Sequence, residues 1–116
     1  RSSDLRLVEG LQKAYRRWPG GIYALWYPIK DRRAVNAFRA ALAEAEIPKV
    51  IDIRFEIRPA SSEPSLDGSG MVVVNPPFPL KEELGVILPA LSRVLSEPAG
   101  GSWRVFEIAG EQVSTE

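Results

Sequence analysis

Residues 22–29 read IYALWYPI, a continuous apolar run. A run of this length predicts a strand that other elements cover on both faces, as in the middle of an α/β sheet. Asp31 follows almost directly and can cap a helix whose apolar residues recur at three- and four-residue steps until Pro48. The stretch therefore predicts a central strand followed by a helix.

The flanking segments extend this unit in both directions. Residues 5–18 carry an apolar stripe at helical spacing, and residues 50–57 alternate between apolar and charged side chains, which predicts a strand with one wet side. Residues 71–74 predict another strand, residues 84–95 a third helix and residues 103–108 a last strand. This order is typical of an α/β domain with a parallel crossover from the first strand to the second. The charged residues of the alternating strand are Asp52, Arg54 and Glu56.

The composition is that of one globular domain and excludes several kinds of site. Of the 116 residues, 45% are hydrophobic and 26% charged, so we expect one domain over residues 1–109 and a flexible tail over residues 110–116. The chain has no cysteine and no histidine, which excludes disulfides, zinc sites of thiolate or imidazole, and a histidine base. The 15 basic and 15 acidic side chains balance, so only local clusters can indicate an anionic partner. The first residue is arginine, and we expect the chain to be a piece of a longer protein.

Residues 72–78 read VVVNPPF, an apolar strand that runs into Asn-Pro-Pro-Phe. The pattern matches the [Asp/Asn/Ser]-Pro-Pro-[Tyr/Phe/Trp] signature of enzymes that methylate exocyclic amino groups of bases. In that signature a side-chain oxygen and a backbone carbonyl accept hydrogen bonds from the amino group, while the aromatic ring stacks on a flipped base. A strand that ends in a proline turn gives the same four residues, so the motif alone leaves both interpretations open.

Two longer stretches carry a more specific resemblance. Residues 21–29 (GIYALWYPI) and 68–78 (GSGMVVVNPPF), with LPAL at residues 88–91, resemble the bacterial 23S rRNA adenine-N6 methyltransferase family, formerly described as needed for using external DNA as a nutrient. The resemblance runs from about Asp4 to Ile108, which is nearly the whole chain. It departs from the family at residue 78, where phenylalanine replaces the usual tryptophan and keeps an aromatic ring.

The resemblance implies a fold and an activity. The chain is then the C-terminal portion of a Rossmann-like class I methyltransferase sheet, with three helices and a mixed sheet that ends in an antiparallel hairpin strand. The full-length protein would be an enzyme that methylates the N6 amino group of an adenine in 23S rRNA, using S-adenosylmethionine and no metal, in the cytoplasm. The cofactor loop and the catalytic Asp-Pro-Pro-Tyr belong to the N-terminal half of the family, so this chain alone supplies no catalytic and no cofactor-binding residue and is expected to be inactive.

The resemblance also implies the partners. These are 23S rRNA and the missing N-terminal half of the same protein. Without that half the first strand keeps an open apolar edge, so we expect the isolated chain to self-associate through it.

The RNA is expected at one edge of the sheet, because ligands of α/β sheets gather at the carboxyl ends of the parallel strands. Arg32 and Arg33 fall in the first turn of a helix, where the macrodipole disfavours cations, so a phosphate of RNA could compensate for them; a solvated helix start is the alternative. Tyr27 could stack on a base or belong to the core. The candidate RNA-binding residues are Tyr27, Pro28, Lys30, Arg32, Arg33, Arg58 and Ser69.

The implied fold gives Asn75 a different place. The strand over residues 71–74 would run antiparallel to its neighbours and end at the far edge, so Asn75 to Phe78 are expected to be structural. The alternative to an enzyme is a non-catalytic interaction domain or a nucleic-acid-binding domain. In the latter, nucleic acid would be bound without catalysis by Lys30, Arg32, Arg33 and Arg58.

Overall fold

The computed structural model describes residues 3–59, 66–96 and 100–109, which form three helices and four strands. In chain order they are α1 (Ser3–Arg17), β1 (Tyr23–Ile29), α2 (Arg32–Glu44), β2 (Val50–Glu56), β3 (Gly68–Val74), α3 (Leu80–Leu95) and β4 (Ser102–Ala109). The predicted order of helices and strands is confirmed. The predicted tail over residues 110–116 lies outside the described residues.

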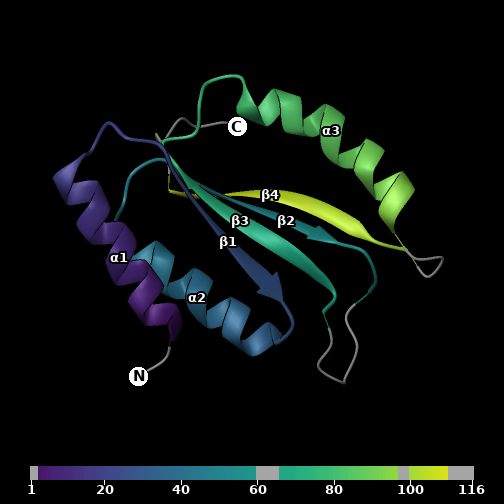
Figure 1. The fold of residues 1–116 in the computed structure, drawn as a ribbon, viewed down its shortest axis with the longest axis horizontal. Coiled ribbons are helices and arrows are strands. Elements are labelled where there is room, and N and C mark those ends of the chain that lie inside the picture. The colour runs from purple at the N-terminus through teal and green to yellow at the C-terminus, as the bar shows by residue number, and fades with distance from the viewer. Residues whose placement is uncertain (1–2, 60–65, 97–99, 110–116) are drawn as a thin grey trace.

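The strands form one sheet in the order β1-β3-β2-β4, and each neighbouring pair is antiparallel. β1 and β2 run in the same direction, as the predicted crossover requires, but β3 lies between them (Figure 1). The antiparallel hairpin strand implied by the resemblance is therefore β3, which folds back from β2 and pairs with β1 on its other side.

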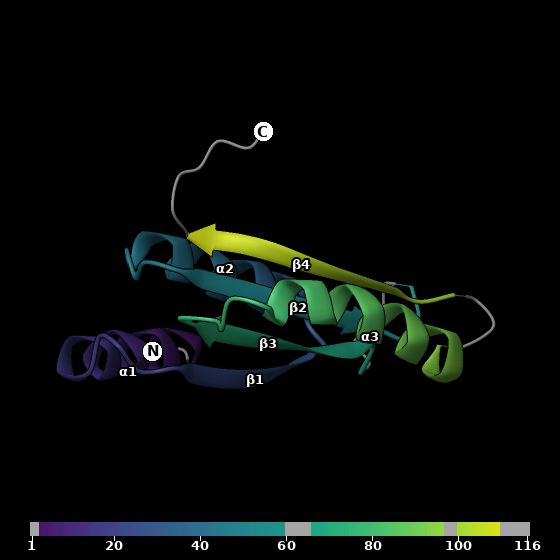
Figure 2. The ribbon, with the colours of Figure 1, turned by 90° about the horizontal axis from the view of Figure 1, so that it is seen from above.

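β1 lies at the edge of the described sheet, opposite β4 (Figure 2). The apolar run predicted a central strand, which is wrong for the described residues, because the side of β1 away from β3 has no neighbouring strand among them.

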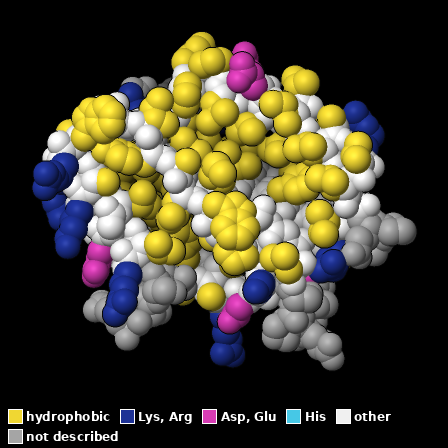
Figure 3. Space-filling model, in the orientation of Figure 1, with side chains coloured by type: hydrophobic (Ala, Val, Ile, Leu, Met, Phe, Trp, Pro, Cys, Tyr) yellow, Lys and Arg dark blue, Asp and Glu magenta, His cyan; other side chains and the backbone are white. Residues whose placement is uncertain are grey.

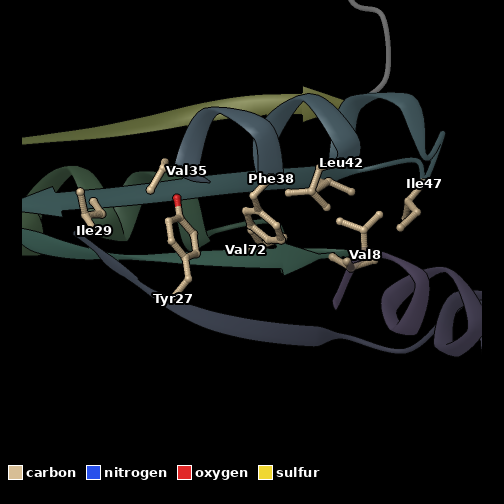
Figure 4. Packing of buried hydrophobic residues seen from close by; sticks show 10 residues of the cluster. Val8, Tyr27, Ile29, Val35, Phe38, Leu42, Ile47 and Val72 are labelled. Carbon is tan, nitrogen blue, oxygen red and sulfur yellow. The ribbon is translucent and has the colours of Figure 1, made fainter. Parts of the chain in front are cut away.

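α1 and α2 lie against one face of the sheet, and α3 lies on the other (Figure 1). α2 begins where the sequence predicted, because Asp31 is its N-cap and accepts a hydrogen bond of 3.0 Å from the backbone N–H of Arg33. Between these two helices and the sheet lies the hydrophobic core (Figure 4). Burial of one large aliphatic or aromatic side chain there contributes about 1.5–3 kcal/mol. The buried members of this cluster are Val8, Tyr27, Ile29, Val35, Phe38, Leu42, Ile47, Val50, Val72 and Val74.

The charged face of β2 differs from its prediction. Asp52, Arg54 and Glu56 were expected to face water, but Asp52 is only 1% exposed and the other two are largely buried under α2. Arg39 of α2 reaches over this face and stacks on Phe106 of β4, with its guanidinium carbon 3.6 Å from the ring centroid. Alternation predicted which side chains share a face, but it carries no information on what covers that face.

Gly70 lies opposite Tyr27 in the sheet, and a Cβ at this position would collide with the tyrosine ring. Gly70→Ala should therefore lower the free energy of unfolding by about 1–3 kcal/mol, because the ring has to move. Gly85→Ala is the matched control, since open space surrounds Gly85 in α3 and alanine should stabilise a helix interior by about 0.5–1 kcal/mol. Urea denaturation measures both, and equal effects would contradict the close packing at Gly70.

Candidate nucleic-acid interface

The carboxyl ends of β1 and β2 meet at one edge of the sheet, because the two strands run in the same direction. The first turn of α2 and the first residues of β3 lie at this edge too (Figure 1). All seven residues that the sequence predicted to contact RNA come from these segments. The structure therefore brings them to one region, where their side chains take different roles.

Tyr27 belongs to the core. Its side chain points between the sheet and α2 (Figure 4), and its ring packs on Phe38 with 5.2 Å between the centroids. The hydroxyl donates a hydrogen bond of 2.5 Å to Oδ1 of Asp52. Burial raises the pKa of Tyr27 above its ordinary value, and the bond to Asp52 raises the pKa further, so the hydroxyl stays protonated. With its ring buried, Tyr27 has no face open to a base in this structure.

Arg32 is held by two carboxylates. Its Nη1 and Nη2 donate to the two oxygens of Glu56, each at 3.0 Å, and Nη2 lies 3.4 Å from Oδ2 of Asp67. The bidentate bond to Glu56 raises the pKa of Arg32. Glu56 therefore supplies the negative charge that offsets a cation in the first turn of α2, a role that the sequence argument gave to a phosphate.

Arg58 joins the same cluster. Its Nη1 donates to the backbone oxygen of Leu66 and lies 3.5 Å from Oδ1 of Asp67, which is buried. The backbone N–H of Asp67 donates to Ile29 at 2.9 Å. These bonds tie the residues after β2 to the end of β1, so both arginines hold the ends of the connection between β2 and β3 in place.

The other predicted residues lie nearer the surface. Pro28, Lys30 and Arg33 are exposed, and Ser69 is partly buried opposite Pro28 in the sheet. No hydrogen bond or ion pair joins the side chains of Lys30 and Arg33 to the residues that the structure describes. These two cations are available to an anionic partner, and RNA binding by the predicted set stays a prediction.

A cavity of about 280 Å³ opens beside these residues, and its lining includes a tryptophan that was not among the residues predicted from the sequence. Trp26, which is 57% exposed, lines it together with Leu7, Pro28 and Lys30. The apolar run hides the difference between Trp26 and its buried neighbour Tyr27; the alternation of side chains along an edge strand could have revealed it. An exposed indole and the cation of Lys30 therefore line the same cavity.

Asn75 lies at the opposite end of the strands, where β3 ends and β1 begins, as predicted. Its Nδ2 donates to the backbone oxygens of Pro19 and Gly21, both at 2.7 Å, and its backbone N–H donates to Lys49 at 2.8 Å. Phe78 is 98% exposed. The amide of Asn75 therefore fastens the entry of β1 to the end of β3.

Within residues 3–59, 66–96 and 100–109, no three histidine, cysteine, aspartate or glutamate side chains are grouped so that they could bind a metal ion. Over the same ranges, no helix has the length and apolar character needed to cross a membrane.

Comparison with known proteins shows the family of the chain. A family model described as "Ribosomal RNA large subunit methyltransferase D, RlmJ" matches residues 2–108. The chain belongs to this family. Its relatives include "Ribosomal RNA large subunit methyltransferase J" of Haemophilus influenzae, 35% identical over 105 residues, which make up 90% of this chain and 37% of that protein. The Escherichia coli protein of the same name is 36% identical over 94 residues, or 81% of this chain and 33% of that protein.

A solved structure supports the fold. The chain is similar to the crystal structure of a Legionella pneumophila protein, with a TM-score of 0.79 and 22% identity, over 92% of this chain and 39% of that one. At this identity the likeness concerns the fold alone. The matched part of the chain covers 37% and 33% of the length of the Haemophilus and Escherichia relatives, which is about a third of each.

Asn75→Ala should lower the free energy of unfolding by about 1–3 kcal/mol, because two carbonyl groups lose their donor at the entry of β1. Asn36→Ala is the matched control: Asn36 is exposed on α2, where alanine favours the helix. Thermal unfolding of both variants checks this, and an unchanged melting temperature for Asn75→Ala would contradict the fastening role.

Proposed function

We propose that this chain is the C-terminal part of an enzyme that methylates the N6 amino group of an adenine in 23S rRNA, with S-adenosylmethionine as methyl donor. The match of the family model over residues 2–108 is the observation that supports it most. The sheet order agrees, because β3 lies antiparallel between β1 and β2 as the hairpin strand of such a sheet would. An rRNA substrate also favours a cytoplasmic protein.

The described residues do not fit the cofactor themselves. The connection from β1 to α2 consists of Lys30 and Asp31 and has no glycine, and the Asp31 side chain caps its own helix. A cofactor loop of this class needs glycines for a tight turn and an acidic residue free to bind the ribose. The methyl donor and the catalytic groups are therefore assigned to the rest of the longer protein.

This chain has an apolar surface that the proposed N-terminal half would cover. β1 offers an open edge, and exposed apolar side chains continue from it across the sheet face on the α3 side. Figure 3 shows apolar side chains gathered over the middle of this view. The missing N-terminal half would bury this surface in the full-length protein, and a second copy would bury part of it in the isolated chain. The exposed large apolar residues of this surface include Ile22 just before β1, Trp26 of β1, Met71 of β3 and Trp103 of β4.

A comparison of the longer protein with the 116-residue chain tests the function. With labelled S-adenosylmethionine and unmodified 23S rRNA, the longer protein should label adenine N6, and the chain alone should not. Titration calorimetry should give the chain a dissociation constant weaker than about 10 μM for the cofactor. A constant of about 10 μM corresponds to a binding free energy of about 7 kcal/mol, which requires the cofactor pocket that we assign to the rest of the longer protein. Sedimentation of the isolated chain should show dimers.

The outcomes separate the alternatives. Tight cofactor binding by the chain alone would contradict its assignment as a non-catalytic part. RNA binding without methyl transfer by the longer protein would favour the non-catalytic nucleic-acid-binding domain.

In the longer protein, Lys30→Ala combined with Arg33→Ala should weaken RNA binding and lower the salt slope by about 1.4 to 2 units, because two exposed phosphate contacts are lost. Lys13→Ala with Arg93→Ala removes the same charge from exposed positions on α1 and α3 and is the matched control. Filter binding at several salt concentrations measures both, and equal slopes would place the RNA elsewhere.

A further inference from the structure

A second cavity lies on the α2 side of the sheet, between the first turn of α2 and the strands β2 and β4. Its volume is about 240 Å³. Three of its lining residues are arginines that come from three different elements, and one is a carboxylate. The lining residues are Arg32, Arg54, Glu56, Ser102, Arg104 and Phe106.

The nearby carboxylates are already engaged. Both oxygens of Glu56 accept from Arg32, and Asp52 accepts from Tyr27 and from Nε of Arg54 at 3.3 Å. Two arginine donors are left over: Nε of Arg32 and Nη2 of Arg54 are buried and have no hydrogen-bond partner in the described part of the chain. Buried donors are nearly always bonded, so these two arginine side chains have unused hydrogen-bonding capacity beside one cavity.

The sheet also opposes two like charges here. Arg54 of β2 lies directly opposite Arg104 of β4. Arg104 is exposed and forms no hydrogen bond or ion pair with any described residue. Like charges at directly opposite positions of an antiparallel pair are destabilising. Without a ligand the two guanidinium groups therefore repel each other, and an anion bound between them would offset this repulsion.

We propose that this cavity binds a phosphate group. Arginine forks match the oxygens of phosphate, and the Ser102 hydroxyl adds a neutral donor in the same lining. The group could be a phosphodiester of RNA or a free phosphate, since both present the same oxygens. The assignment rests on the cavity alone and stands whether or not the proposed methyl transfer is confirmed.

Thermal unfolding of the 116-residue chain with inorganic phosphate, against chloride at equal ionic strength, tests the cavity. Phosphate at about ten times its dissociation constant should raise the folding equilibrium constant about tenfold. Arg104→Gln should abolish this gain while leaving the chain as stable as, or more stable than, the parent in chloride, because the repulsion with Arg54 is gone. Arg93→Gln, at an exposed position on α3, is the matched control and should keep the gain.

A second experiment titrates the 116-residue chain with a short single-stranded oligoribonucleotide. Tighter binding of the oligonucleotide than of phosphate, reduced by Arg104→Gln, assigns the cavity to RNA; the reverse order assigns it to a free phosphate. Equal responses of the parent, Arg104→Gln and Arg93→Gln, or no response of the parent to either ligand, would overturn the proposal.

Discussion

The hydrogen bond from Tyr27 to Asp52 joins two strands that are not neighbours. β3 separates β1 from β2, and the tyrosine side chain crosses it above Gly70, where only a glycine leaves room. Asp52 is buried, and a buried carboxylate is stable only with strong partners, here Tyr27 and Arg54. Removing a partner from such a charge costs about 3–5 kcal/mol. The position of α2 follows from the same bond, because Phe38 packs on the ring of Tyr27.

The two faces of the sheet serve different purposes. On the α2 side, charged residues of β2 are paired with one another and with α2. Arg32 and Arg58 bind Asp67 and so hold the connection after β2. On the α3 side the strands present apolar side chains such as Trp26 and Met71, which are exposed. Exposed apolar side chains gathered on one face are typical of an interaction surface. The chemistry and the cofactor are proposed for further parts of a longer protein because the connection from β1 to α2 has no glycine and Asp31 caps its own helix.

Much of the fold could be predicted from the sequence, because local periods and caps determine it. The order of helices and strands, the cap at Asp31 and the far-edge place of Asn75 are confirmed. The predictions that failed needed knowledge of neighbours. An all-apolar run cannot tell Trp26, which is exposed, from Tyr27, which is buried, and alternation cannot tell whether water or α2 covers Asp52. For the candidate site, the sequence indicated the right edge, but it gave no sign that Arg32 is paired with Glu56.

The insertion of β3 between β1 and β2 also constrains the order of folding. Among the residues that the structure describes, the only hydrogen-bonded neighbour of β1 is β3, whose last residue, Val74, pairs with Tyr23 at the start of β1. The sheet therefore cannot grow along the chain from its first strand. The hairpin of β2 and β3 closes a shorter loop, so its formation costs less conformational entropy and it is expected to form first. β1 pairs with a strand that lies much further along the sequence, so this pairing is expected later. During synthesis, α1, β1 and α2 would leave the ribosome before β3 is made, so the apolar side chains of β1 stay uncovered by a neighbouring strand of the described sheet until β3 forms.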